Sequence, residues 1–198
     1  MLKGVIFDMD GTITKPFIDW KALREEIGVP PGQMIMHYID SLEGKAKTEA
    51  EAILVRRENE AATHSELNEG VRELLAYLEE HQVKIALVTN NCRSSVGIIL
   101  EKHGLDFELI LTREDGEIKP SGDLIAKALA GMGLQIDEAI VIGDGKLDIE
   151  ASREAGVLAV YLSNGSPTFE HRPTVRSMRE VIGLVRSLQT RPIPPLRE

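Results

Sequence analysis

The sequence predicts an α/β protein in which a doubly wound parallel sheet carries a small inserted helical domain. An apolar run at residues 5–7 leads directly into two aspartates and a glycine, as a strand buried on both faces does. From residue 83 onward, strand-like and helix-like segments alternate, which favours right-handed crossovers between parallel strands. Residues 15–80 carry helical patterns without a strand. We therefore expect a Rossmann-like core with an insertion after its first strand.

These patterns also predict the domain boundaries. The α/β core domain is expected at residues 1–14 and 82–190, and a domain of four helices is expected at residues 15–81. The proline-rich end, residues 191–198, cannot continue a helix, so we expect a loose tail there.

Four helices are expected in the inserted domain. The first begins at Asp19 and ends at Gly28, because a glycine followed by prolines is typical of a helix end. The third begins at Thr48, which matches a capping box together with Glu51. The remaining two are expected at residues 33–42 and 68–80.

In the core domain, strands and helices are expected in turn. Ser177 and Glu180 match a second capping box, which places the last helix at residues 177–188. The other helices are expected at residues 94–103, 121–131 and 146–155. The strands after the first are expected at residues 83–88, 107–111, 139–143 and 157–161.

Composition limits the class of protein. With 198 residues, of which 42% are apolar and 28% charged, the chain can form one soluble, well-buried core with a small insertion. The net charge of −9 argues against a nucleic acid or an anionic membrane as the main partner. The single cysteine, Cys92, excludes an internal disulfide framework and a cysteine-based zinc site. No signal peptide or apolar run of membrane-spanning length is visible, so we expect a cytoplasmic protein.

Asp8 and Asp10 follow the first strand, at the place where open α/β sheets bind their ligands. Two carboxylates this close repel each other and lose hydration, so a positive partner is expected nearby. A divalent cation is the simplest candidate. The ordinary alternative is that both aspartates are turn residues or helix caps.

Polar side chains also follow the later core strands. Thr89 ends the strand at residues 83–88, Lys119 lies in the loop after the next strand, and Asp144 ends the strand after that. Each has an ordinary explanation by itself, as a helix cap, a solvated lysine or a turn residue. Together, these explanations do not account for the presence of carboxylates, a hydroxyl and one lysine just after core strands. The carboxyl ends of these strands would lie on the same side of a parallel sheet. The pattern therefore favours one shared site.

These segments, in this order, resemble the four motifs of the haloacid dehalogenase superfamily. The motif residues are Asp8-Met9-Asp10-Gly11-Thr12, Thr89-Asn90, Lys119-Pro120 and Gly143-Asp144 with Asp148. The resemblance covers residues 4–162, and the helical insertion resembles the cap of the phosphatase branch, in which phosphoglycolate phosphatases belong. Gly145 stands where the fourth motif often has a serine, which removes one hydroxyl contact.

The resemblance implies phosphoryl transfer through an aspartyl-phosphate. Asp8 would be the nucleophile, and Asp10 would be the acid that protonates the leaving group and then the base that activates water. Thr89 and the backbone amide of Asn90 would hold phosphate oxygens. Lys119 would stabilise charge on the transferring group.

The resemblance also implies a bound Mg²⁺ ion. Its ligands would be Asp8, Asp144 and the backbone carbonyl of Asp10, and Asp148 would support or join them. The expected activity is the Mg²⁺-dependent hydrolysis of a small phosphorylated metabolite, such as phosphoglycolate or a sugar phosphate, by a monomer or a homodimer. A sugar phosphomutase and a catalytically idle binding member stay open as alternatives, whereas an acid at Asp10 argues against a dehalogenase.

Overall fold

The computed structural model describes residues 1–194, and these divide by their internal contacts into two compact units. An α/β unit contains residues Met1–Lys15, Glu66–Asn90 and the described residues from Leu105 onward. A helical unit contains Pro16–Ser65 and Asn91–Gly104.

A parallel sheet lies within the α/β unit. In chain order its strands are β1 (Gly4–Phe7), β2 (Lys84–Val88), β3 (Leu109–Leu111), β4 (Ala139–Gly143), β5 (Leu158–Leu162) and β6 (Thr174–Val175). They are arranged in the order β3-β2-β1-β4-β5-β6. The chain thus extends the sheet to one side of β1 and then to the other, which confirms the predicted doubly wound arrangement.

β1 is central because both of its faces are apolar. Val5 lies opposite Ile85 of β2 and Ile140 of β4, and the residues of β1 are buried on both faces of the sheet. Since all of these pairings are parallel, the carboxyl ends of β1, β2 and β4 lie at one edge of the sheet. Residues that directly follow these strands are therefore brought together.

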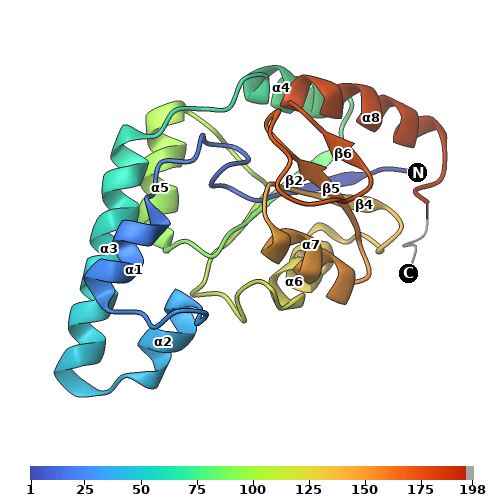
Figure 1. The fold of residues 1–198 in the computed structure, drawn as a ribbon. Helices are drawn as coiled ribbons and strands as arrows, with labels where there is room; N and C mark the ends of the chain where they lie inside the picture. The colour runs from blue at the N-terminus through green and yellow to red at the C-terminus, as the bar shows by residue number, and fades with distance from the viewer. Residues whose placement is uncertain (195–198) are drawn as a thin grey trace. The chain divides into compact units, whose positions relative to one another are not determined.

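Helices cover both faces of this sheet. On one face lie α4 (Val71–Glu80) and α8 (Met178–Thr190), and on the other lie α6 (Asp123–Met132) and α7 (Lys146–Glu154) (Figure 1). On the α6 side of the sheet, apolar residues of the helix pack against apolar residues of adjacent strands. The residues of this core include Leu124, Ile125, Ala128, Ile6, Ala86 and Val141. Burying these apolar side chains is the main favourable contribution to folding of the unit.

The helical unit contains α1 (Trp20–Ile27), α2 (Ile35–Ser41), α3 (Gly44–His64) and α5 (Arg93–His103). Its small core is made by α1, α2 and α3, through Leu23, Ile39, Ala50 and Leu54. Within residues 1–194, none of the helices combines the length and the apolar composition that crossing a lipid bilayer requires.

The ends of α1 agree with the sequence prediction. The Asp19 carboxylate accepts hydrogen bonds from the N–H groups of Lys21 and Ala22, at 3.1 and 3.0 Å. At the other end, Gly28 adopts the left-handed conformation with φ of 81°, which glycine adopts without strain.

Both predicted capping boxes are wrong. α3 begins at Gly44, one turn before Thr48, and the Thr48 hydroxyl donates to the carbonyl of Gly44 inside the helix. At α8, Ser177 is the N-cap residue as predicted, but its side chain makes no capping bond, and the Glu180 carboxylate accepts the N–H of Arg176 instead. Serine, threonine and glutamate side chains can bond several nearby backbone groups, so spacing alone does not decide between them.

The two compact units differ from the predicted domain boundaries. Residues 66–90, which contain α4, group with the sheet, and residues 91–104, which contain α5, group with the other helices. The division into domains stays a prediction. The predicted tail, residues 191–198, lies partly outside the described residues, and within the described part Ile193 is buried.

Candidate active site

The candidate site begins at the carboxyl end of β1. Asp8 directly follows this strand, and its backbone N–H donates to the carbonyl of Ile142 in β4 at 2.9 Å. The neighbouring strand therefore fixes the position of Asp8. Only 8% of the residue is exposed, so its carboxylate needs a positive or hydrogen-bonding partner.

Lys119 is that partner. It lies in the loop between β3 and α6, and its Nζ donates to Oδ1 of Asp8 at 2.5 Å, to Oδ1 of Asp148 at 2.6 Å and to the carbonyl of Val88 at 3.1 Å. These acceptors use all three hydrogens of the ammonium group. With 4% of the residue exposed, Lys119 is a buried counter-ion and not a solvated loop lysine.

The side chain of Asn90 holds the backbone of Lys119. Its Nδ2 donates to the carbonyl of Lys119, and its Oδ1 accepts from the N–H of the same residue, both at 2.9 Å. Because Asn90 lies just beyond β2, these two hydrogen bonds join the end of that strand to the loop between β3 and α6, which we call the lysine loop. The sequence predicted phosphate binding by the backbone amide of Asn90, and it did not predict this role of the side chain.

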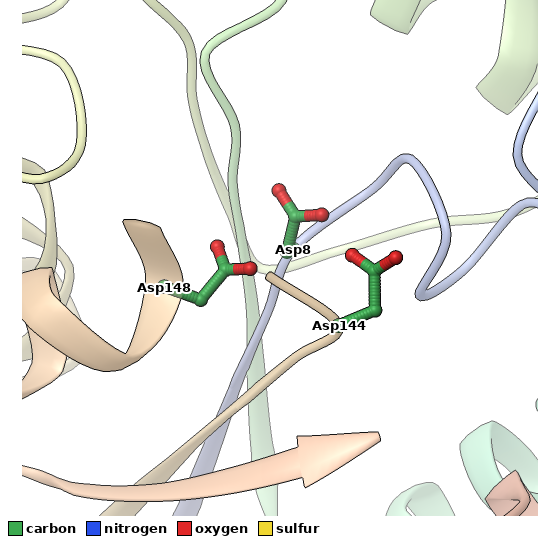
Figure 2. A group of neighbouring side chains, drawn as sticks. All are labelled: Asp8, Asp144 and Asp148. Atoms are coloured by element: carbon green, nitrogen blue, oxygen red, sulfur yellow. The ribbon is translucent and has the colours of Figure 1, made fainter. Parts of the chain in front are cut away.

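Asp144 and Asp148 bring two further carboxylates to Asp8. Asp144 follows β4, and Asp148 lies in the first turn of α7, where its Oδ2 accepts the N–H of Gly145 at 3.0 Å. One oxygen from each of the three carboxylates lies within 4.8 Å of the others. Figure 2 shows the side chains coming from the end of β1, the loop after β4 and the start of α7. We call Asp8, Asp144 and Asp148 the acidic cluster.

Two glycines leave room for the acidic cluster. A Cβ atom on Gly11 would lie 1.9 Å from Oδ2 of Asp144, and one on Gly143 would lie 2.3 Å from Cβ of Asp148. Gly11 also has a φ of +81°, which L side chains rarely adopt. The glycines in the first and fourth motifs are therefore required by the carboxylates beside them.

The acidic cluster holds more negative charge than Lys119 neutralises. Burial raises the pKa of Asp8 well above its usual value, against the opposing effect of Lys119. Burial, followed by the charge of Asp148, raises the pKa of Asp144 to about 7. Burial would by itself lower the pKa of Lys119, but Asp148 and Asp8 outweigh burial and raise it, so this lysine stays charged. A further cation here would lower the pKa values of the carboxyl groups.

Asp10 and Thr89 were predicted to act at the same site. Oδ1 of Asp10 accepts a hydrogen bond from the Thr14 hydroxyl at 3.3 Å, and the charge of Asp10 contributes to the raised pKa of Asp144. Thr89 is buried beyond β2, and its backbone N–H donates to the carbonyl of Leu111 at 3.0 Å. The catalytic roles of both residues stay predictions.

Two asparagines outside the motifs hold the loop that follows Asp10. The side-chain amides of Asn68 and Asn164 both donate to the carbonyl of Gly11. Neither residue was predicted to belong to the site, because an isolated asparagine far away in the chain gives no spacing signal. Only the tertiary structure brings them to this loop.

Known proteins are similar to this chain along most of its length. The family described as Haloacid dehalogenase-like hydrolase matches residues 16–162, which is more than half of the chain. A phosphoglycolate phosphatase from Chromobacterium violaceum is 30% identical, over 94% of this chain and 97% of the relative. The chain belongs to the haloacid dehalogenase-like hydrolase family. The predicted family and the assignment to its hydrolases are thereby confirmed.

Two further known proteins illustrate the extent of the likeness. Pyrophosphatase PpaX from Halalkalibacterium halodurans is 28% identical, over 93% of this chain and 97% of the relative. The crystal structure of a hydrolase from Pseudomonas syringae has a TM-score of 0.79 at 21% identity, and it covers 94% of this chain and 99% of the other. At that identity the structural likeness supports the fold alone. The family match begins at residue 16, so Asp8 and Asp10 lie outside it, and their catalytic roles stay predictions.

Proposed function

We propose that this haloacid dehalogenase-like hydrolase is a Mg²⁺-dependent phosphatase that acts on a small phosphorylated metabolite through an aspartyl-phosphate on Asp8. The buried Lys119, bound to Asp8 at 2.5 Å and to Asp148 at 2.6 Å, is the observation that carries this proposal. A carboxylate nucleophile next to a fixed positive charge suits attack on a phosphoryl group, because the charge offsets that of the phosphate oxygens.

The reaction has two steps in this proposal. An oxygen of Asp8 bonds to phosphorus while the bond from phosphorus to the leaving oxygen breaks, and Asp10 gives its proton to that oxygen. An alcohol leaves. In the second step Asp10 takes a proton from water, the water oxygen bonds to phosphorus, and the bond from phosphorus to Asp8 breaks. Inorganic phosphate leaves, and both aspartates return to their starting states.

The donors of the acidic cluster fit Mg²⁺. Three carboxylates lie within 4.8 Å of one another, and one lysine leaves them with excess negative charge. Carboxylate and carbonyl oxygens are the ligands that Mg²⁺ prefers. Asp8, Asp144 and the backbone carbonyl of Asp10 would hold the ion, which would supply positive charge to the phosphoryl oxygens.

Asp148, Thr89 and Asn90 have supporting roles. Both oxygens of Asp148 accept hydrogen bonds, from Nζ of Lys119 and from the N–H of Gly145, so we assign Asp148 to holding the lysine in place. The Thr89 hydroxyl and the backbone N–H of Asn90 would bind phosphate oxygens, because both residues follow β2 at the edge of the sheet that carries the acidic cluster.

The named relatives suggest the first substrates. One is a phosphoglycolate phosphatase and another a pyrophosphatase, so phosphoglycolate and inorganic pyrophosphate belong in a panel with sugar phosphates. p-Nitrophenyl phosphate serves as a general substrate. The measured quantity is the inorganic phosphate released, with Mg²⁺ and with EDTA.

We expect Mg²⁺-dependent release of phosphate and its loss by at least ~10³-fold in Asp8→Asn, since removing a nucleophile eliminates the covalent route. Asp137→Asn is the matched control, because Asp137 is exposed and precedes β4, at the opposite end of that strand from Asp144. Acid-quenched wild-type protein should also yield a phosphorylated peptide that contains Asp8.

Two outcomes would contradict the proposal. Conversion of a sugar phosphate into its isomer, without net release of phosphate, would support the phosphomutase alternative. Absence of turnover with every substrate and divalent cation would support a catalytically idle binding protein.

A further inference from the structure

We infer that Asn68 is a positioning residue that holds the loop after β1 and, through Thr14, orients the carboxyl group of Asp10. The inference rests on the proposed function, in which Asp10 gives its proton to the leaving group. Asn68 lies outside the four motifs, and its contacts within the α/β unit carry the inference.

One side-chain amide bonds three backbone carbonyls of this loop. Nδ2 of Asn68 donates to the carbonyl of Gly11 at 2.8 Å, to that of Thr12 at 2.8 Å and to that of Thr14 at 3.2 Å. An amide nitrogen carries two hydrogens, so at least one of them is shared between two carbonyls. The loop therefore curves around this nitrogen.

The orientation of the Asn68 amide is unambiguous. All three groups that face Nδ2 are carbonyl oxygens, which accept hydrogen bonds and do not donate them. The opposite orientation would place Oδ1 against three oxygens and leave every one of these contacts repulsive. The amide is half-buried, so water does not simply replace it.

The backbone joins the same two segments. The N–H of Asn68 donates to the carbonyl of Ile13 at 2.9 Å, and Thr14 forms an antiparallel bridge with Leu67. The segment at residues 67–68 thus contacts the loop through its backbone as well as through the Asn68 amide. Its register against the loop is fixed.

Thr14 connects this loop to Asp10. The Thr14 hydroxyl lies 3.3 Å from Oδ1 of Asp10 and from the carbonyl of Met9, and Thr14 also forms a backbone bridge with Asp10. A group that holds the Thr14 carbonyl therefore acts on the orientation of the Asp10 carboxyl. Asn68 does so at 3.2 Å.

A second amide reaches the loop from another element. Asn164, which lies two residues beyond β5, donates from Nδ2 to the carbonyl of Gly11 at 2.8 Å. It bonds one carbonyl, whereas Asn68 bonds three. Asn164→Ala should therefore disturb the loop in the same way as Asn68→Ala, but its effect should be smaller.

The chemistry predicts a specific signature. When the bond from phosphorus to the leaving oxygen breaks, that oxygen gains an electron pair and takes the proton of Asp10. A weakly acidic leaving group needs this proton, whereas the anion of an acidic phenol leaves without it. Misplacing Asp10 should therefore slow substrates with poor leaving groups more than those with good ones.

The experiment compares kcat/KM for p-nitrophenyl phosphate and phenyl phosphate, which differ in the acidity of the phenol. The ratio of kcat/KM for p-nitrophenyl phosphate to kcat/KM for phenyl phosphate does not depend on how much of the sample is folded. We expect the ratio to rise about 100-fold in Asp10→Asn, the size of a general-acid contribution, and about 5- to 20-fold in Asn68→Ala and Asn68→Asp.

Glu66→Gln is the matched control. It weakens the exposed ion pair between Lys15 and Glu66, which joins the same two segments, and leaves the Asn68 amide in place. Its ratio should stay within about twofold of the wild type.

The outcomes separate the inference from the proposed function. A raised ratio in Asp10→Asn with an unchanged ratio in Asn68→Ala would overturn the role of Asn68 alone. An inactive wild type, or an Asp10→Asn variant with the wild-type ratio, would overturn the assignment of Asp10 and with it the inference.

Discussion

Lys119 shows how strongly one side chain can determine a site. Its ammonium group is buried and bonds two members of the acidic cluster, Asp8 and Asp148, together with a backbone carbonyl. Taking an ion pair out of water is costly, and the close geometry of these bonds compensates for that cost. Removing the lysine leaves buried carboxylates without their counter-ion.

We therefore predict that Lys119→Met lowers the free energy of unfolding by about 3–5 kcal/mol near neutral pH in EDTA. The double variant Lys119→Met/Asp148→Asn should recover part of the loss, because it removes one of the unpaired charges. Urea unfolding followed by circular dichroism measures both values.

Lys127→Met is the control for this variant. Lys127 pairs with Asp123 at 2.7 Å on the surface, so the change should cost no more than about 1 kcal/mol. Equal losses in the two variants would mean that burial of Lys119 has no special energetic consequence.

At the scale of elements, the site depends on hydrogen bonds between the residues that end one strand and the loop that follows another strand. The side chain of Asn90 holds both backbone polar groups of Lys119. The start of the lysine loop is closed by Asp115, whose carboxylate accepts from the N–H and the hydroxyl of Thr112 at 2.8 Å. These bonds set the direction in which the lysine side chain leaves its loop.

Asn90→Ala should accordingly lower kcat by about 10- to 100-fold, since small misplacements of a catalytic group have effects of this size. The loss should be equal for p-nitrophenyl phosphate and phenyl phosphate, because in the proposed function Lys119 acts on the phosphoryl charge and not on the leaving group. Steady-state kinetics with both substrates measures this.

Ser121→Ala tests whether any change in the lysine loop has the same effect. The Ser121 hydroxyl donates to the Glu117 carboxylate at 3.2 Å, away from Lys119 itself, so the variant should keep kcat within about twofold. If the loss of kcat in Asn90→Ala differed between the two leaving groups, that result would contradict the role given to the Asn90 side chain.

Helix ends and short strands show where local patterns lose their predictive value. Asp19 and Gly28 bound α1 as expected, because an aspartate cap and a left-handed glycine act within one turn. Thr48 matches the same kind of spacing but lies inside α3. β6 was not predicted, because its two residues are a strand only by pairing with β5.

For the whole molecule, the acidic cluster couples stability to pH. The pKa of Asp144 is about 7 in the folded protein, against a usual value of 3.8. Between these values the folded chain binds more protons than the unfolded chain, so stability decreases as pH rises through this window. Asp8, whose pKa is also raised, acts in the same direction.

We predict that the metal-free protein has a lower Tm at about pH 8 than at about pH 5.5, and that Asp144→Asn reduces this difference. Mg²⁺ should raise the Tm of the wild type more at the higher pH, because the ion binds the deprotonated carboxylates. Thermal unfolding in EDTA and in Mg²⁺ measures both effects. A Tm that is independent of pH in EDTA would contradict the raised pKa.

The sequence by itself determined the alternation of strands and helices, the doubly wound sheet and most of the residues at the edge of the sheet where the acidic cluster lies. Apolar runs that end in Asp8, Thr89 and Asp144 identify buried parallel strands, and parallel strands must present their ends on one side. The position of Lys119 could be predicted for the same reason, since its loop also leaves that edge.

Only the tertiary structure decided how these groups are held. Asp148 binds the lysine, Asn90 fixes the lysine backbone, and Asn68 bonds the loop beyond Asp10. Each of these bonds joins segments that are far apart in the chain, through side chains with no periodic pattern. Hydrogen-bond partners of this kind are determined by three-dimensional position, whereas strand ends are determined by the order of apolar and polar residues.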